Sequence, residues 1–308
     1  MKIATTTSDF RGYVQTDAEA VRAFEGTGFK HLDYSFYKSN YDGSEFMSND
    51  WVKGVSAAAK EAERLGFDFV QAHSPGNDYF RCDKETVIKG NIRSIEACGY
   101  LGIKKLVVHS GRCNDYHGEA DWKTYINEVK NFYEKLYPAM ENYNVYVCAE
   151  NYIPSGSDIC SFYSGESLME LMEICDHPLM GVCWDIGHAN LTGPDQYKDI
   201  IRLGDKLQAV HIQDNYGLND DHICPLFGTV DIDSVMRGLI DNGFTDKGGV
   251  FTFEAENIVT RLKSWPNPRN EFGESLANIP TLEAKIKAEI LIYEIGKSIL
   301  TKYNLYED

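Results

Sequence analysis

Two sequence patterns alternate from one end of the chain to the other, and this alternation limits the fold more than any other feature. Short apolar runs rich in β-branched residues predict buried strands, and longer segments with a 3.6-residue period predict amphipathic helices. The predicted strands span residues 2–9, 31–36, 67–73, 104–110, 145–151, 179–185, 207–214 and 250–256. The predicted helices span residues 16–27, 49–65, 84–101, 121–142, 165–175, 194–203, 231–242 and 279–302.

The residues between these segments support the same division. Glycine stands where a helix must end, as in RLGFDFV and YLGIKKL, and Ser164 and Asp231 stand where helices begin. Strands recur roughly every 27–42 residues, which is typical of a (β/α)8 repeat. A doubly wound sheet alternates in the same way, but no strand here leads into a GxGxxG or GxxxxGK[ST] turn. We therefore predict an α/β fold, a single (β/α)8 TIM barrel over residues 1–308, with a long loop at 257–275 before the last helix.

Composition restricts the partners that such a chain can have. The 308 residues carry a formal net charge of −17, which repels nucleic acids and anionic membrane surfaces. No apolar run approaches the length of about 18–20 residues that spans a bilayer. The 8 cysteines show no CxxC spacing and several lie in apolar runs, so we expect reduced, buried thiols. The first residues, MKIATTTSDF, lack the apolar region of a signal peptide, which predicts a cytoplasmic protein.

Polar side chains mark the ends of the predicted strands, where a barrel builds its active site. Acidic groups at the ends of buried strands are costly unless they are paired or bind a metal. The last four strands end at Glu150, Asp185, His211 and Glu254, which offer three carboxylates and one imidazole. Taken singly, such residues are also typical of hydrogen-bonded fillers and helix caps, but one metal centre explains them together. This ligand set predicts a divalent ion, with Mn²⁺ preferred and Co²⁺, Mg²⁺ or Zn²⁺ as alternatives, and no organic cofactor.

Six motifs together resemble one enzyme family. They are VVHSG (107–111), CAEN (148–151), GVCWDIGHAN (181–190), VHIQDN (210–215), DDHICPLFGTVDID (220–233) and TFEAE (252–256). The chain resembles the sugar phosphate isomerase/epimerase superfamily, the xylose-isomerase-like barrels that also include the endonuclease IV type of apurinic endonuclease (AP endonuclease family 2).

The resemblance implies a role for each residue of the site. It makes Glu150, Asp185, His211 and Glu254 the metal ligands, Glu150 and Glu254 also the acid/base pair, and His188 the group that binds a substrate oxygen. The endonuclease-like members hold three zinc ions with a larger ligand set, and the chain keeps residues for it. These additional metal or substrate positions are His73, His109, Asp220 and His222.

Two departures from the family pattern bear on the substrate. Leu226 and Phe227 replace a glycine and a usually polar residue, which predicts a bulkier and more apolar loop over the metal. Where epimerases often carry an arginine shortly after the strand-7 histidine, this chain has Asn215, Tyr216 and Gly217. The expected clamp on the substrate's terminal oxygens is missing, and both departures favour bulky or non-phosphorylated substrates.

Several functions remain open on this interpretation. The first is a metal-dependent isomerase or epimerase that acts on a sugar or keto-sugar through an enediolate intermediate, the metal acting as a Lewis acid. The same site also suits a lyase or dehydratase acting on a keto-sugar or 3-keto-glycoside. A three-zinc apurinic-site endonuclease is a further alternative, opposed by the net charge although loop arginines are present: Arg11, Arg81, Arg112, Arg261 and Arg269.

Two remaining alternatives carry less weight. A Schiff-base aldolase needs a lysine at a strand end, and none of the predicted ends carries one. A sugar-binding module without catalysis, or one subunit of a heteromeric enzyme, would use the aromatic segment 257–275 as a contact. We expect a small-molecule sugar or keto-sugar as partner, no nucleic acid, and either a homo-oligomer or a subunit of a heteromer.

Overall fold

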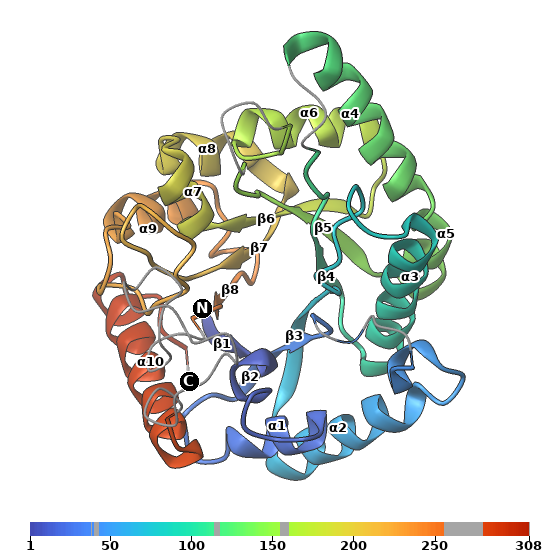
Figure 1. Ribbon diagram of the computed structural model, residues 1–308. Helices are drawn as coiled ribbons and strands as arrows, with labels where there is room; N and C mark the ends of the chain where they lie inside the picture. The colour runs from blue at the N-terminus through green and yellow to red at the C-terminus, as the bar shows by residue number, and fades with distance from the viewer. Residues whose placement is uncertain (38, 40–42, 114–117, 155–159, 256–279, 308) are drawn as a thin grey trace, which may run out of the picture.

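Eight parallel strands form a barrel in the part of the chain that the structure describes (Figure 1). The structure is a computed structural model that describes residues 1–37, 39, 43–113, 118–154, 160–255 and 280–307. The strands pair in the order β7-β6-β5-β4-β3-β2-β1-β8, and a parallel bridge between Ile212 and Phe253 joins the two ends of the sheet. The predicted (β/α)8 TIM barrel is confirmed.

The strands are short and lie between the helices along the chain. They are β1 (Lys2–Thr6), β2 (His31–Ser35), β3 (Asp68–His73), β4 (Lys105–Val108), β5 (Tyr146–Glu150), β6 (Met180–Asp185), β7 (Leu207–His211) and β8 (Val250–Phe253). The first half of the chain supplies the helices α1 (Asp17–Ala23), α2 (Val52–Leu65), α3 (Lys84–Leu101), α4 (Gly118–Glu134) and α5 (Tyr137–Tyr143). The second half supplies α6 (Gly165–Cys175), α7 (Ile186–Thr192), α8 (Gln196–Leu203), α9 (Ile232–Asp241) and α10 (Leu282–Lys302).

The helices end and begin at the residues that the sequence marks. Gly66 and Gly102 follow α2 and α3 with φ of 72° and 75°, the left-handed conformation that glycine adopts without steric cost. The Ser164 side chain accepts a hydrogen bond from the Ser167 amide, and the Asp231 side chain accepts one from the Ser234 amide. Both predicted N-caps are therefore confirmed.

Local structure differs from the sequence prediction in several places. The single helix predicted over 121–142 is two helices, α4 and α5, because Pro138 in the first turn of α5 has no amide hydrogen for a continuous helix. The strand predicted over 2–9 ends at Thr6, whose side chain caps a 3₁₀ turn, η1 (Thr7–Phe10). Helix α7 directly after β6 was not predicted. The last helix begins at Leu282 rather than 279, and the loop at 257–275 lies outside the described residues.

The barrel interior is lined by small side chains. Val107, Cys148, Cys183 and Ala209, one from each of β4 to β7, form a buried cluster separate from the larger core between the strands and the helices. All 8 cysteines are unpaired thiols and 7 of them are buried, with Cys82 as the exposed exception. The prediction of free, buried thiols holds for these seven.

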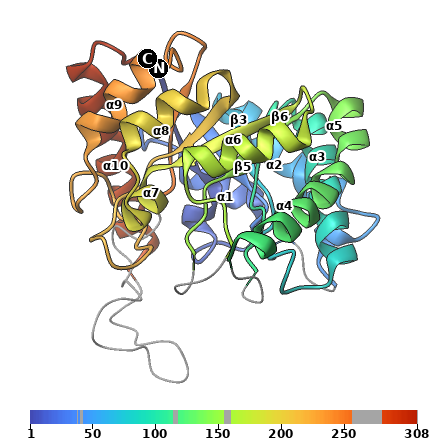
Figure 2. The same cartoon turned by 90° about the horizontal axis from the view of Figure 1, so that it is seen from above.

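The two faces of the barrel have different contents. The chain termini meet on one face, where the Met1 amino group lies 3.0 Å from the Glu307 carboxylate, and the loops that follow the strands lie on the other (Figure 2). None of the helices in the described ranges is long and apolar enough to cross a membrane. The site described next lies on the face formed by the carboxyl ends of the strands.

Candidate metal centre

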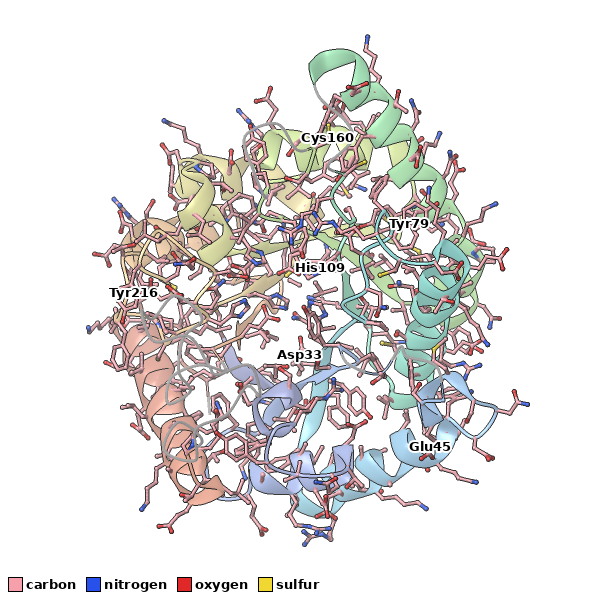
Figure 3. All side chains as sticks on the ribbon, in the orientation of Figure 1. Asp33, Glu45, Tyr79, His109, Cys160 and Tyr216 are labelled. Atoms are coloured by element: carbon pink, nitrogen blue, oxygen red, sulfur yellow. The ribbon has the colours of Figure 1, made fainter. Side chains whose placement is uncertain are left out.

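Six polar side chains lie at or just beyond the carboxyl ends of consecutive strands. His73, Glu150, Asp185 and His211 are the last residues of β3, β5, β6 and β7, while His109 and Glu254 directly follow β4 and β8. Strand register brings them together, since Asp185 pairs with His211 across β6 and β7. His109 is among the side chains near the middle of the barrel in Figure 3, whereas Tyr216 lies at its periphery.

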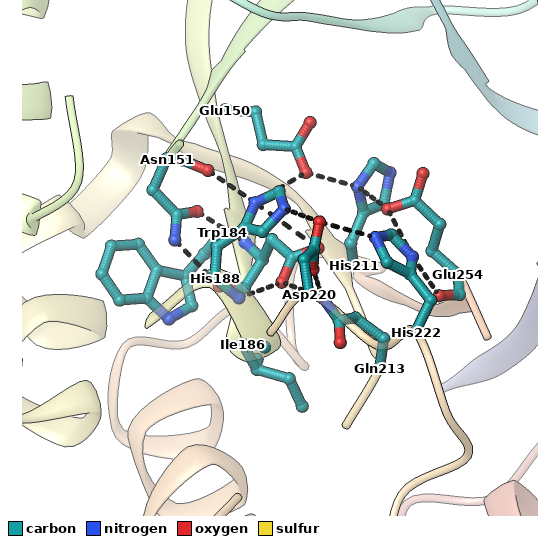
Figure 4. A network of polar contacts seen from close by, with 12 residues as sticks. Glu150, Asn151, Trp184, Ile186, His188, His211, Gln213, Asp220, His222 and Glu254 are labelled. Atoms are coloured by element: carbon teal, nitrogen blue, oxygen red, sulfur yellow. Dashed lines mark hydrogen bonds and ion pairs between the residues drawn. The ribbon is translucent and has the colours of Figure 1, made fainter. Parts of the chain in front are cut away.

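The four residues predicted as metal ligands form one compact group. One ligand atom from each of Glu150, Asp185, His211 and Glu254 lies within 4.8 Å of the others. His211 Nδ1 is 2.7 Å from Glu150 Oε1 and 3.1 Å from Glu254 Oε2 (Figure 4). The Glu150 and Asp185 side chains are fully buried, whereas 14% of the Glu254 side chain is exposed.

The four additional positions form two further groups around this one. His73 and His109 join Glu150, whose Oε2 lies 2.7 Å from His109 Nε2 and 3.5 Å from His73 Nε2. Glu150 therefore belongs to two groups and presents a different oxygen to each.

The third group lies on the other side and contains His188, Asp220 and His222. Asp220 Oδ2 is 3.3 Å from His188 Nε2 and 3.1 Å from His222 Nε2. Gln213 joins this group to the central one, because its amide donates to Asp185 Oδ1 at 3.2 Å and to Asp220 Oδ1 at 3.0 Å. The structure thus brings all nine sequence-predicted site residues together.

Backbone carbonyls fix the orientation of three histidine rings. Nδ1 of His73, His188 and His222 lies 2.8–2.9 Å from the carbonyl oxygens of Ser74, Asn151 and Glu254, respectively. A carbonyl can only accept, so each Nδ1 carries a proton, and Nε2 is the nitrogen that faces the centre and would bind a metal once its own proton is displaced. Each of these Nε2 atoms is directed at a carboxylate of the centre.

The chemistry of the donor set fits a divalent cation. Glu150 Oε2 and Asp185 Oδ2 are buried without a hydrogen-bond partner among the described residues, an arrangement that is costly for a carboxylate. Glu150 Oε2 and His109 Nε2 approach to 2.7 Å without hydrogen-bond geometry, which suits two ligands that share an ion. Carboxylates and neutral imidazoles are the ligands that Mn²⁺, Co²⁺ and Zn²⁺ accept in proteins.

The proton affinities of the site show how strongly its charges interact. Burial, together with the neighbouring carboxylates, raises the pKa of Asp185 to about 6. Burial opposes protonation of His188, but the Asp185 and Asp220 carboxylates outweigh it and raise its pKa to about 10. Burial likewise opposes ionisation of Glu150, and its contacts with His211 and His109 hold its pKa well below the usual value. The centre therefore concentrates negative charge that protons partly balance, which is the electrostatic setting of a cation site.

Asp185 has two structural roles at once. Its Oδ1 accepts the amide hydrogen of His188 at 2.7 Å and so caps α7, the helix that the sequence did not predict. Asn151 fixes the same residue, because its side chain accepts from the Asp185 amide and donates to the Asp185 carbonyl. The alternative of a simple helix cap is correct for Asp185, and its Oδ2 remains available for the metal group.

Sequence reasoning missed the residues that support the ligands. Asn151 and Gln213 stand inside the CAEN and VHIQDN motifs, so their position beside a ligand was the available signal. The Tyr152 ring stacks on the His109 ring, with the centroids 4.6 Å apart, and meets His188 edge-on at 5.8 Å. Contacts of this kind depend on tertiary structure, and no spacing pattern in the sequence predicts them.

One buried carboxylate accepts hydrogen bonds from the backbone of the loop that carries Leu226 and Phe227. Asp214 accepts backbone hydrogen bonds at 2.8–3.1 Å from four amides: Asn215, Leu226, Gly228 and Val230. Leu226 has a φ of 76°, and the Leu226 and Phe227 residues are 58% and 48% exposed. The loop is apolar at its surface, as the sequence predicted.

Comparison with known proteins identifies the family. Residues 21–281 match the model of the xylose isomerase-like TIM barrel, so the chain belongs to this family and the resemblance seen in the sequence is confirmed.

Two curated relatives illustrate how far the sequence similarity extends. An uncharacterized protein of Methanocaldococcus jannaschii, MJ1311, is 28% identical over 177 residues, which are 56% of this chain and 57% of the relative. A probable endonuclease 4 of Mesomycoplasma hyopneumoniae strain J is 26% identical over 167 residues, 50% of this chain and 58% of the relative. The matched part of the chain thus spans little more than half the length of these relatives.

Solved structures resemble almost the whole chain. A D-tagatose 3-epimerase-like protein superposes with a TM-score of 0.71 at 20% identity, covering 99% of this chain and 98% of its own. The 3-keto-D-glucoside 4-epimerase YcjR of E. coli gives a TM-score of 0.67 at 16% identity, covering 96% and 99%. The IOLI protein, solved with a bound zinc atom, gives 0.70 at 15% identity, covering 98% and 99%. At these identities the similarity shows a shared fold.

Proposed function

We propose that the chain is a divalent-metal-dependent enzyme that isomerises or epimerises a sugar or keto-sugar. The observation that carries this proposal is the compact group of Glu150, Asp185, His211 and Glu254 at the strand ends of the barrel. These four residues would hold the ion, with Mn²⁺ preferred. When bound, the ion supplies Lewis-acid stabilisation of negative charge on the oxygens of the substrate. The sugar epimerases among the structural neighbours support the choice of substrate.

The burial of the two glutamates assigns them different roles in this reaction. Glu150 is fully buried and directs its two oxygens at different histidines, which suits a fixed ligand. Glu254 is partly exposed and contacts His211 through one oxygen, so it is the better placed to take a proton from a carbon next to a carbonyl. Glu254 removes this proton to leave an enediolate. Return of the proton by Glu254 to the neighbouring carbon gives the isomer, and return of a proton by Glu150 to the other face gives the epimer.

His188 completes the set of residues that contact the substrate. Its Nδ1 proton is engaged by the Asn151 carbonyl, so its Nε2 faces the centre, where it can hydrogen-bond an oxygen of the sugar. Loss of a neighbouring substituent from the same enediolate would make the enzyme a dehydratase or a lyase on a 3-keto-glycoside. One structural neighbour is described as a probable 3-DHS dehydratase, so this outcome belongs in the same assay.

Solvent exchange tests the proposal even while the product is unidentified. Protein reconstituted with Mn²⁺ is incubated in D₂O with a panel of ketohexoses and 3-keto-glucosides, and deuterium incorporation at carbon is followed by NMR and mass spectrometry. We expect incorporation into at least one sugar, and a loss of about 10²–10⁴-fold in Glu254→Gln, the range for removal of a general base.

A matched variant separates chemistry from charge. Glu283→Gln removes the same charge from an exposed glutamate of α10 and should exchange deuterium at the wild-type rate. Full activity of Glu254→Gln, or no exchange with any sugar of the panel, would refute the proposed reaction.

A second candidate function rests on the two additional ligand groups. His73, His109 and Glu150 on one side and His188, Asp220 and His222 on the other provide places for two further ions. Three ions would suit hydrolysis of a phosphodiester at an apurinic site, and curated relatives named probable endonuclease 4 support this candidate. Zinc-reconstituted protein that nicks an abasic duplex, and spares the same duplex with an intact base, would establish it. The net charge of −17 weighs against it, because duplex binding needs a basic surface.

A further inference from the structure

Arg112 lies beside the centre, on the loop that follows β4. Its guanidinium carbon is 4.7 Å from the centroid of the Tyr152 ring. The same ring stacks on His109 at 4.6 Å, with the two planes inclined by 26°. One aromatic side chain therefore contacts both the guanidinium and a histidine of the metal centre.

The hydrogen bonds of Arg112 leave one edge of its guanidinium without a partner among the described residues. Nη1 donates to the Ile153 carbonyl at 3.0 Å, and the backbone amide of Arg112 donates to Asp78 Oδ2 at 3.2 Å. Nε is buried and donates to no acceptor among the described residues. Nε and Nη2 form the side of the guanidinium that binds two oxygens of a carboxylate or a phosphate in parallel, and Nε makes no hydrogen bond to a described residue on this side.

The other described loop arginines differ from Arg112 because each lies close to a carboxylate. Arg11 lies 3.8 Å from an Asp17 oxygen, and Arg81 lies 4.0 Å from an Asp78 oxygen. Within the described ranges, the Arg112 guanidinium has no carboxylate within 4.0 Å, although the chain carries 47 acidic residues. A cation left without a counter-ion next to a site for a small molecule is a common way to recognise a charged group of that molecule.

We propose that Arg112, supported by Tyr152, binds an anionic group of the substrate, a phosphate or a carboxylate, at the end away from the reacting carbons. This proposal rests on the proposed sugar substrate and names the charge that the sugar carries. Arg112 would then be a specificity-determining residue, with the Nε–Nη2 edge as the receptor. It would take the place of the arginine that is missing after β7, where Asn215, Tyr216 and Gly217 stand, and the expectation of a non-phosphorylated substrate, which rested on that missing arginine, would then no longer apply.

A comparison of matched ligands tests this assignment. Calorimetric titration of the Mn²⁺-bound protein uses each ketohexose that exchanges deuterium, its 6-phosphate and the corresponding keto-uronate. We expect one of the two anionic forms to bind at least tenfold more tightly than the neutral sugar, and its identity separates phosphate from carboxylate. Arg112→Gln should abolish this preference and leave the affinity for the neutral sugar within twofold of the wild-type value.

Two more variants make the result specific. Arg112→Lys keeps the charge without the two-pronged edge, so it should retain only part of the preference. Arg81→Gln removes a charge from the loop after β3 and should keep the full preference. Metal content and unfolding temperature, measured on each variant, show that the fold and the centre are intact.

The outcomes separate this proposal from the proposed function. If the sugars bind but the anionic forms gain nothing over the neutral ones, or if Arg112→Gln keeps the preference, the role of Arg112 is refuted and the sugar-acting function stands. If no sugar binds in any form to the metal-loaded protein, both proposals fail. Equal weakening of neutral and anionic ligands in Arg112→Gln would also refute a role in reading charge.

Discussion

Replacing Glu150 by glutamine should remove more metal than any other single change in the centre. The side chain is fully buried, with Oε1 2.7 Å from His211 Nδ1 and Oε2 2.7 Å from His109 Nε2, so it serves two ligand groups. Glutamine keeps the shape but loses the charge and one oxygen. We expect Glu150→Gln to lose the ion of the central group and the ion of the group with His73.

A second variant shows whether this loss follows the geometry. Asp220 belongs only to the group with His188 and His222, so Asp220→Asn should lose one ion if three are bound and none if one is bound. An ion present at 100 times its dissociation constant stabilises the folded state by about 2.7 kcal/mol. At about 2 °C per kcal/mol for a chain of this size, each lost ion lowers the unfolding temperature by roughly 5 °C.

The assay combines elemental analysis with thermal unfolding. Each protein is purified without chelator or affinity-metal contact and dialysed against Mn²⁺ or Zn²⁺, and its metal content per chain is measured. Unfolding temperatures are then compared with and without EDTA. If Glu150→Gln keeps the metal content of the wild type, or if Asp220→Asn loses as many ions as Glu150→Gln, then Glu150 is not a ligand shared by two groups.

Three further predictions follow from the contacts of single residues. Asn151→Ala removes two hydrogen bonds to the backbone of Asp185. It should lower the free energy of unfolding by about 1–3 kcal/mol and the metal affinity roughly tenfold to hundredfold. An unchanged metal affinity, measured by competition with a chelator, would contradict this. Leu226 has a left-handed backbone, which costs a residue other than glycine about 1–2 kcal/mol, whereas glycine loses about 0.5–1 kcal/mol of conformational entropy on folding. Leu226→Gly should therefore raise the free energy of unfolding, measured in urea, by roughly 0.5–1 kcal/mol, and a decrease would contradict this reasoning. Hydrogen bonds from Arg64 and a second arginine lower the pKa of Glu61 to about 2. Since its unfolded value is about 4.3, Glu61 stabilises the fold above that pH, and the deficit of Glu61→Gln in urea unfolding should shrink, not grow, as pH falls towards 2.

The fold was predictable because its signals are local. Each strand is a short apolar run, each helix has its own period, and residues such as Gly66 and Asp231 mark their boundaries. The exceptions have local causes too. Pro138 divides one predicted helix in two, and α7 was not predicted because its first five residues belong to the motif GVCWDIGHAN, which was interpreted as carrying metal ligands.

The convergence of the nine site residues also followed from the sequence, but their division into groups did not. In a barrel the carboxyl ends of all strands share one face, so a list of strand ends is already a list of neighbours. Which oxygen of Glu150 meets which histidine depends on side-chain direction. The contact of Arg112 with Tyr152 joins the loops after β4 and β5, and neither loop signals it alone.

The number of bound ions determines which reaction His188 can serve. Its Nδ1 proton is donated to the Asn151 carbonyl, which leaves Nε2 as the nitrogen that faces the centre. Nε2 lies near Asp220 and His222, and it can bind an ion with them or hydrogen-bond a sugar, but not both. With only the central group filled, His188 is a substrate-binding residue and proton transfer by Glu254 is the available chemistry. With all three groups filled, His188 is a ligand and the centre is built to hydrolyse a phosphate ester, so the metal content of the protein selects between the two proposed functions.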